Sequence, residues 1–171
     1  GVEVNNYIYD INLFMKNYNQ TEPDIEKEVD KPSHTIGEEV KYTLKVKPLA
    51  FDMAEYQELI VTDELAKELD FYMLGHSTGP TAAESVVFYS GSGTDDKDVM
   101  APVTDYVVTT PKVGESGTIV WTFTEAGIKK LTGIDAGDGS RIELSFSGLT
   151  NNKVWVDGSL YNDAKLDFVN K

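Results

Sequence analysis

The sequence predicts an all-β protein, an antiparallel β-sandwich with one or two short helices. Three observations favour this fold class: short segments alternate apolar and polar residues, turn residues separate them, and only two brief stretches are rich in helix formers. With 171 residues, 40% of them hydrophobic, the chain is long enough to bury a core. We therefore expect two packed sheets rather than a helical bundle.

The predicted elements follow one another at short intervals. The segments whose alternation predicts strands are 24–30, 40–47, 59–63, 70–74, 85–89, 104–110, 118–123, 141–147 and 159–169. Helix formers predict a short helix at 64–69 and another at 125–131, which Gly133 ends. The region 75–102 carries many Gly and Pro residues, and outside its one strand we expect loops there.

The amino-terminal part is predicted to be separate from the sandwich. Residues 4–16 alternate and read as an extended segment, and residues 17–22 read as a polar linker. We therefore divide the chain into a strand and linker from a preceding domain at 1–22 and a sandwich domain at 23–171. Because Gly1–Val4 already resembles the interior of a strand, we expect the chain to be cut from a longer secreted protein.

Composition excludes several classes of function. The net charge of −14 argues against binding to nucleic acid or to an anionic membrane, since both need a basic patch. Without cysteine there is no disulfide, thiolate metal site or thiol nucleophile. No apolar run reaches membrane-spanning length. Acidic clusters at 95–98 and 135–138 lack the spacing of a calcium-binding loop, so we predict no metal site.

Strand parity places three polar side chains on inward faces. Lys27 lies between Ile25 and Val29 on the inward side of its strand. Asp63 continues an apolar face at 59–63, and Asn162 lies on the apolar face of 159–169. Taken singly, such a Lys can extend to the rim of the core, such an Asp can cap a helix and such an Asn can bond to backbone.

Taken together, the three side chains predict formation of an amide bond. A buried lysine tends to lose its proton and become a nucleophile, and a buried carboxyl group tends to gain one. A neutral Asp63 could polarise the Asn162 carbonyl and carry protons while Lys27 attacks the amide carbon and ammonia leaves. Such a bond would join the first and last strands of the sandwich and needs no cofactor.

Four segments carry a resemblance to a known family. They are Pro23-Asp24-Ile25-Glu26-Lys27-Glu28-Val29-Asp30, Gly37-Glu38-Glu39-Val40-Lys41-Tyr42-Thr43-Leu44-Lys45-Val46, Val61-Thr62-Asp63-Glu64-Leu65 and Asn162-Asp163-Ala164-Lys165-Leu166. Together they resemble the middle domain of Gram-positive, sortase-assembled major (shaft) pilins, of the collagen-adhesin (CnaA) type. The resemblance spans nearly all of 23–171. It implies an Ig-like sandwich with an internal Lys–Asn isopeptide bond.

The resemblance assigns a role to each inward polar residue. It implies that Lys27 and Asn162 form the bond and that Asp63 is the acid that transfers protons. Asn170, eight residues on and of the same parity, is the alternative partner. Glu143 is an alternative acid, although its parity points it outward.

A second resemblance concerns the segment from Tyr7 to Asn17, which is similar to the pilin motif. In that motif an aromatic-rich strand leads to Tyr-Pro-Lys-Asn, and a class C sortase joins the lysine to another subunit. Lys16 would be the acceptor here, although Phe14 and Met15 stand where the motif has Tyr and Pro.

The resemblance predicts a structural protein, not an enzyme, whose only chemistry is one self-formed bond. Its place would be an extracellular, cell-wall-anchored pilus, and its partners would be other pilin subunits joined by sortase. The alternatives are an adhesin module of the same fold that binds a host or matrix ligand through loops in 75–102, and a hydrolase with paired carboxylates, for which no pair has a meaningful spacing.

Overall fold

The computed structural model describes residues 2–3, 10–16, 24–31, 33–47, 58–78, 84–95, 97–131 and 139–154. Antiparallel strands dominate this part of the chain, and the predicted all-β sandwich is confirmed. In chain order the elements are β1 (Val2–Glu3), β2 (Asp10–Lys16), β3 (Asp24–Val29), β4 (Ser33–His34), β5 (Glu39–Lys47), β6 (Glu58–Glu64), β7 (Leu69–Leu74), β8 (Val86–Tyr89), β9 (Lys97–Val99), β10 (Tyr106–Thr109), β11 (Thr118–Phe123), α1 (Glu125–Leu131), β12 (Arg141–Thr150) and the 3-10 helix η3 (Asn152–Val154).

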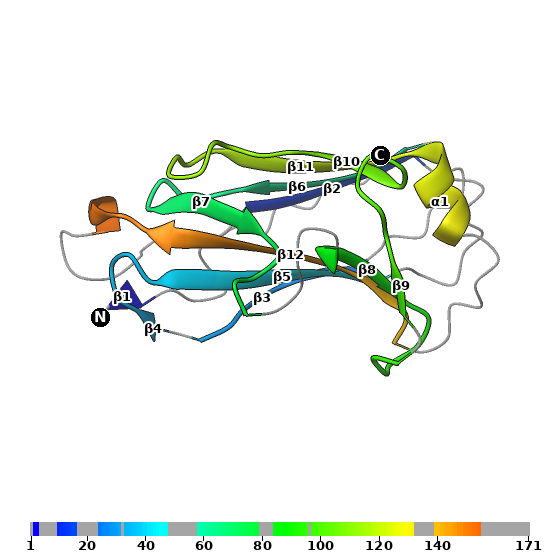
Figure 1. The fold of residues 1–171 in the computed structure, drawn as a ribbon, viewed down its shortest axis with the longest axis horizontal. Helices are drawn as coiled ribbons and strands as arrows, with labels where there is room; N and C mark the ends of the chain where they lie inside the picture. Colours follow the sequence, from blue (N-terminus) through cyan, green and yellow to red (C-terminus); the bar gives the residue numbers. More distant parts are fainter. Residues whose placement is uncertain are drawn as a thin grey trace.

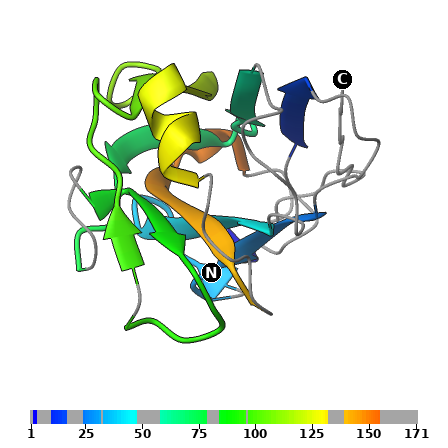
Figure 2. The same cartoon turned by 90° about the vertical axis from the view of Figure 1, so that its right-hand side faces the viewer.

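Two sheets form the layers of the sandwich (Figure 1). One has the strand order β10-β11-β6-β2. The other has the order β3-β5-β12-β8-β9, and β7 also pairs with β12. Among the described residues, β1 and β4 form a separate two-stranded pair. The end view shows α1 across one end of the sandwich (Figure 2).

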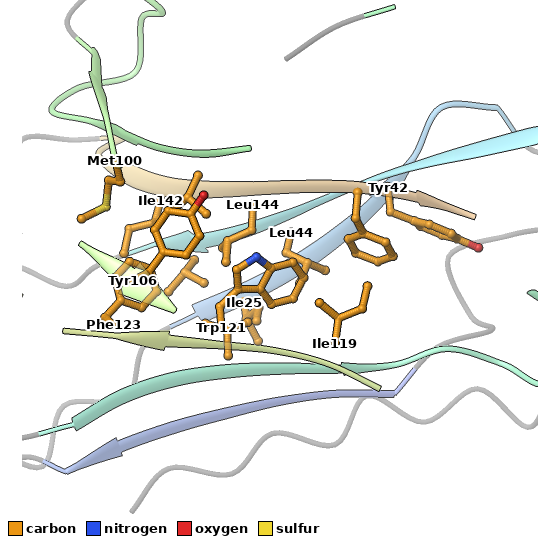
Figure 3. Close-up of a cluster of buried hydrophobic side chains, with 14 of the residues drawn as sticks. Ile25, Tyr42, Leu44, Met100, Tyr106, Ile119, Trp121, Phe123, Ile142 and Leu144 are labelled. Carbon is orange, nitrogen blue, oxygen red and sulfur yellow. The ribbon is translucent and has the colours of Figure 1, made fainter. Parts of the chain in front are cut away.

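The core lies between the sheets because strands of both layers turn their apolar faces inward. Strand β5 alternates half-buried and buried residues along all nine positions, and β11 buries Ile119, Trp121 and Phe123. Aromatic and aliphatic side chains from both layers interdigitate there (Figure 3). Trp121 is fully buried, and its ring centroid lies 5.8 Å from that of Phe146.

Helix α1 was predicted and is confirmed. The Thr124 hydroxyl accepts a hydrogen bond from Gly127 N–H at 3.0 Å, which caps the amino-terminal end of the helix. Glu125 lies in the first turn, and Lys129 and Lys130 lie in the last, as the helix dipole favours.

The predicted helix at 64–69 is wrong. Strand β6 runs to Glu64, a turn follows, and β7 already begins at Leu69. Leu65 N–H donates to the Gly117 carbonyl at 2.9 Å, and the side chains of Leu65 and Leu69 are buried. The hydrogen bond to a distant segment and the burial of the two leucines therefore override the helix propensity of residues 64–69.

Two strands were not predicted, and β12 is longer than predicted. Strand β9 lies in the region assigned to loops, and the two-residue β4 lies outside every predicted strand. Strand β12 extends three residues beyond the predicted 147, with a bulge between Ser147 and Gly148. The predicted strand at 159–169 lies outside the described residues.

The amino-terminal segment contributes a strand to the sandwich. Strand β2 pairs with β6 along all seven of its residues and forms an edge of the first sheet. The extended conformation expected within 4–16 is therefore present at 10–16. The domain division at residue 22 stays a prediction.

Candidate functional site

Lys27 points into the core from β3. The residues on either side of it in the same parity, Ile25 and Val29, are buried and half-buried, whereas Glu28 is exposed. Only 4% of Lys27 is exposed to solvent. The inward position that alternation predicted for this lysine is therefore present.

Asp63 reaches the same interior from the opposite sheet. In β6 the buried residues are Leu59, Val61 and Asp63, which share one face of the strand. Asp63 is fully buried, and it is paired in register with Ile119 of β11. The carboxyl group of Asp63 therefore lies on the face of β6 whose other buried residues are apolar.

The two side chains meet between the layers. Lys27 Nζ lies 2.8 Å from Asp63 Oδ2, and the side chains are 2% and 0% exposed. By contrast, the ion pair Lys47–Glu26 on β5 and β3 has a similar distance, 2.7 Å, with side chains 43% and 44% exposed. Removing two charges from water costs several kcal/mol for each ion, so the buried pair is a costly feature whereas the exposed pair is not.

Two aromatic rings adjoin the lysine amine. Lys27 Nζ lies 4.4 Å from the ring centroid of Tyr42 and 5.4 Å from that of Phe146. The rings are stacked on each other, with centroids 5.3 Å apart and planes at 24°. Burial raises the pKa of Tyr42, and the charges of Asp63 and Asp30 raise it further. The phenol therefore remains protonated.

This arrangement allows a proton to move within the pair. If the proton on Lys27 Nζ moves to Asp63 Oδ2, the products are a neutral amine and a neutral acid. Neutral groups are cheaper to bury than ions, so a site without water favours this exchange more than a surface does. The amine is then a nucleophile and the acid can donate a proton.

The remaining predicted residues are only partly described. Asn162 and Asn170 lie outside the described residues. Lys16 is the last residue of the edge strand β2, opposite Glu58 in register, and its side chain is not described. Glu143 has the outward parity that was predicted, and its Oε2 accepts a 2.6 Å hydrogen bond from Arg141 Nε.

Sequence reasoning missed the aromatic pair next to the amine. Tyr42 and Phe146 take buried positions of β5 and β12. Their proximity to Lys27 depends on strand register, which pairs Tyr42 with both Val29 and Phe146. No local pattern in the sequence specifies that register.

A second buried carboxylate was also missed. Asp105 lies in a turn and is fully buried, and its Oδ2 accepts bonds from Ala101 N–H at 2.7 Å and from Lys130 Nζ at 2.8 Å. Because Lys130 is 40% exposed, this pair differs from the enclosed Lys27–Asp63 pair, and it anchors α1 to the turn before β10.

Neither a metal site nor a membrane-spanning helix occurs in the described residues. Within the described ranges, no group of three or more His, Cys, Asp or Glu residues is arranged to hold a metal ion. No helix in the described part of the chain is long and apolar enough to cross a membrane.

The fold and the buried pair together define a class: a two-layered β-sandwich with a lysine and an aspartate joined between its sheets. Neither a protein-family profile nor a curated protein matches the sequence. Two solved structures share the fold. The full-length major pilin SpaD from Corynebacterium diphtheriae matches with a TM-score of 0.50 and 22% identity over 75% of this chain. The fimbrial protein FimP from Actinomyces oris matches with a TM-score of 0.51 and 20% identity over 74% of this chain.

The chain spans about a quarter of each of those proteins, 26% of SpaD and 27% of FimP. At these identities the likeness shows the fold alone. The chain therefore has a fold that occurs in major pilins, and its function is a separate question that the site has to answer.

Proposed function

We propose that this chain is part of a structural shaft subunit of an extracellular, cell-wall-anchored pilus, crosslinked by an amide bond between Lys27 and Asn162. The observation that carries the proposal is the 2.8 Å pair between Lys27 and Asp63, enclosed between the two sheets. The shared fold with two pilins supports the same assignment.

The proposed reaction exchanges one amide for another. The neutral amine of Lys27 attacks the side-chain carbonyl carbon of Asn162, and a new C–N bond forms. Asp63 hydrogen-bonds to the carbonyl oxygen and carries the proton from the attacking nitrogen to the departing one. The old C–N bond breaks, ammonia leaves, and Asp63 recovers its starting proton.

The described strands leave room for the missing partner. Strand β3 is at the end of its sheet, next to β5, and no other described strand pairs with its second edge. The predicted strand at 159–169 would pair along that edge and bring its inward face beside Lys27. An added strand there would also satisfy the backbone groups of an exposed edge.

Strand register favours Asn162 over Asn170. Lys27 pairs with Leu44, and Leu44 pairs with Leu144, so Lys27 and Leu144 share one level across the sheet. Leu144 lies nine residues before Lys153, the middle residue of η3, and Asn162 lies nine residues after it. If the chain reversed direction at η3 and continued as an extended strand, Asn162 would return to the level of Lys27, whereas Asn170 would lie about 26 Å beyond it.

The proposed bond explains how the fold could bear load without disulfides. It joins positions 27 and 162 and so encloses nearly the whole sandwich. By the loop-closure estimate used for disulfides, a crosslink of that span stabilises by about 4–5 kcal/mol through the unfolded state. Tension on the chain ends would then act on a covalent bond instead of on hydrogen bonds between strands.

The intact mass of the purified chain tests the proposed bond. The parent chain is expected to weigh one ammonia less than its sequence, and the variants Lys27→Ala, Asp63→Ala and Asn162→Ala are expected to weigh their full sequence masses. Asn170→Ala is the matched control and should still lose ammonia. A parent chain of full sequence mass would refute the crosslink, and a full mass in Asn170→Ala alone would move the bond to Asn170.

We also propose that Lys16 is the residue to which a class C sortase joins the next subunit. Lys16 ends an edge strand, and the register opposite Glu58 gives it a neighbour of opposite charge. In the full-length protein, Lys16→Ala should abolish covalent polymers while the mass deficit of the internal bond persists. Lys129→Ala, at a lysine that is 72% exposed on α1, is the control. Normal polymers in Lys16→Ala would refute this assignment.

A further inference from the structure

The stacked rings of Tyr42 and Phe146 form a wall beside the Lys27 amine. The two residues are directly opposite each other on β5 and β12. Lys27 lies diagonally across from Tyr42, because its own partner on β5 is Leu44. This geometry brings the amine to 4.4 Å from one ring centroid and 5.4 Å from the other. Tyr42 lies at one end of the cluster of buried side chains (Figure 3).

A ring face does more for an amine than an aliphatic wall would. The face of an aromatic ring is electron-rich and attracts a cation, and the attraction is larger where water is excluded. Lysine has a long flexible stem, so a buried amine needs several contacts to be held in one place. The ring faces and Asp63 approach the amine from different elements, β5, β12 and β6.

We propose that Tyr42 and Phe146 are positioning residues for amide formation, whose ring faces hold Lys27 Nζ against Asp63 Oδ2. This inference rests on the proposed function and adds two residues to its site. The rings favour the ammonium form, so they keep the lysine at its place in the folded chain. The proton then passes to Asp63 when the amine reacts.

The tyrosine hydroxyl has no part in this role. Tyr42 Oη is buried and has no hydrogen-bond partner among the described residues. The ring of Phe146 lies in the same stack and carries no hydroxyl. Tyr42→Phe therefore preserves the proposed function of the residue and is the matched control for variants that remove the ring face.

The rate of ammonia loss as a function of pH tests the proposal. The full chain is refolded from denaturant at a series of pH values, and its intact mass is followed with time. Within the described part of the chain, the ionisable groups to consider at this site include Asp63, in contact with the amine, and Tyr42, on which Asp30 also acts. Because the proposed step needs a neutral amine and a proton on Asp63, the rate should stay constant while the pair holds one proton and should fall at high pH as the pair loses it.

Two sets of variants at position 42 distinguish the attraction of the ring face for a cation from the effect of side-chain size. Tyr42→Phe should react like the parent. Replacing residue 42 by phenylalanines with increasing numbers of ring fluorines keeps the shape and weakens the attraction for a cation. The pH of half-maximal rate should then fall stepwise, by about 0.5–1.5 pH units in total. In Tyr42→Leu the maximal rate should also fall, by about tenfold to a hundredfold, because the amine is no longer held in place.

The outcomes are separable. An unchanged pH of half-maximal rate across the fluorinated series would overturn the role of the rings, even if the parent chain forms its bond. A parent chain that never loses ammonia would instead refute the proposed function. If Tyr42→Leu does not fold, the fluorinated series alone decides, because it preserves packing. Phe146→Leu gives an independent test with the same expected direction.

Discussion

The enclosed pair of Lys27 and Asp63 predicts a large and specific loss of stability when one partner is removed. The side chains are 2% and 0% exposed, so neither charge can turn to water when the other is gone. Breaking a buried pair on one side costs about 3–5 kcal/mol, whereas replacing both partners by apolar residues is often neutral or stabilising. We therefore expect Lys27→Met and Asp63→Val each to be about 3–5 kcal/mol less stable than the double variant.

Lys27→Met, Asp63→Val and the double variant all lack a group that the proposed crosslink needs. Differences in stability among them therefore report the cost of the buried charge alone. Urea unfolding followed by tryptophan fluorescence gives the free energy of unfolding of each. The control is the exposed pair of Lys47 and Glu26, where Lys47→Met in the double-variant background should cost less than about 1 kcal/mol because 43% of the lysine side chain is in solvent. Single variants as stable as the double variant would refute the reasoning.

The two single variants should also respond to pH in opposite ways. In Lys27→Met, burial is expected to raise the pKa of Asp63 above its unfolded value, so the stability of the variant should be full below about pH 4 and fall as pH rises through the folded pKa. In Asp63→Val, burial is expected to lower the pKa of Lys27 below its unfolded value, so the stability of the variant should be full above about pH 10.4 and fall as pH drops through the folded pKa. Parallel pH profiles would contradict this account.

Two further predictions concern other parts of the sandwich. At Gly127 of α1 an added Cβ would lie 1.9 Å from the Asp105 carbonyl oxygen, so Gly127→Ala should lower the free energy of unfolding by about 1–3 kcal/mol. Gly93→Ala is the control: no atom lies within 4 Å of the added Cβ, so the free energy should change by less than about 0.5 kcal/mol. Equal effects of the two substitutions would contradict the close approach at Gly127. Burial lowers the pKa of His34, although its hydrogen bond to Asp30 opposes the shift. The stability contribution of His34 should therefore be full above about pH 6.5 and decline as pH falls through the folded pKa. If stability declines by the same amount in His34→Gln, other groups cause the decline.

The sequence by itself determined most of the described strands and the face to which most of their side chains point. Alternation is a local property of extended backbone, since neighbouring side chains point to opposite faces. It therefore identified Lys27 and Asp63 as inward polar residues and Glu143 as outward, and the structure has all three as expected. The helix at 125–131 was equally local, because its cap and its charged turns lie within a few residues.

Other features had no local signal. Residues 97–99 form the edge strand β9 although Lys97 and Asp98 are charged and exposed, because an edge strand with exposed residues needs no apolar alternation. Ser145 and Ser147 have the outward parity of β12 but are buried. For Ser145, the chain that follows β7 approaches that face, and Gly75 N–H donates to its carbonyl. Residues 64–69 favour a helix by composition, but contacts with a distant segment hold them as a strand end and a turn.

In the site of Lys27 and Asp63 too, the sequence determined the face of each side chain, and the tertiary structure determined their contact. Parity could state that Lys27 and Asp63 face a core, but it could not state that they face each other, because they lie on different sheets. Only the packing of one layer on the other brings Nζ within 2.8 Å of Oδ2, and only the register of β5 with β3 and β12 adds the two rings. Sheet packing and register depend on the whole chain, so the tertiary structure alone decided that these inward residues form one site.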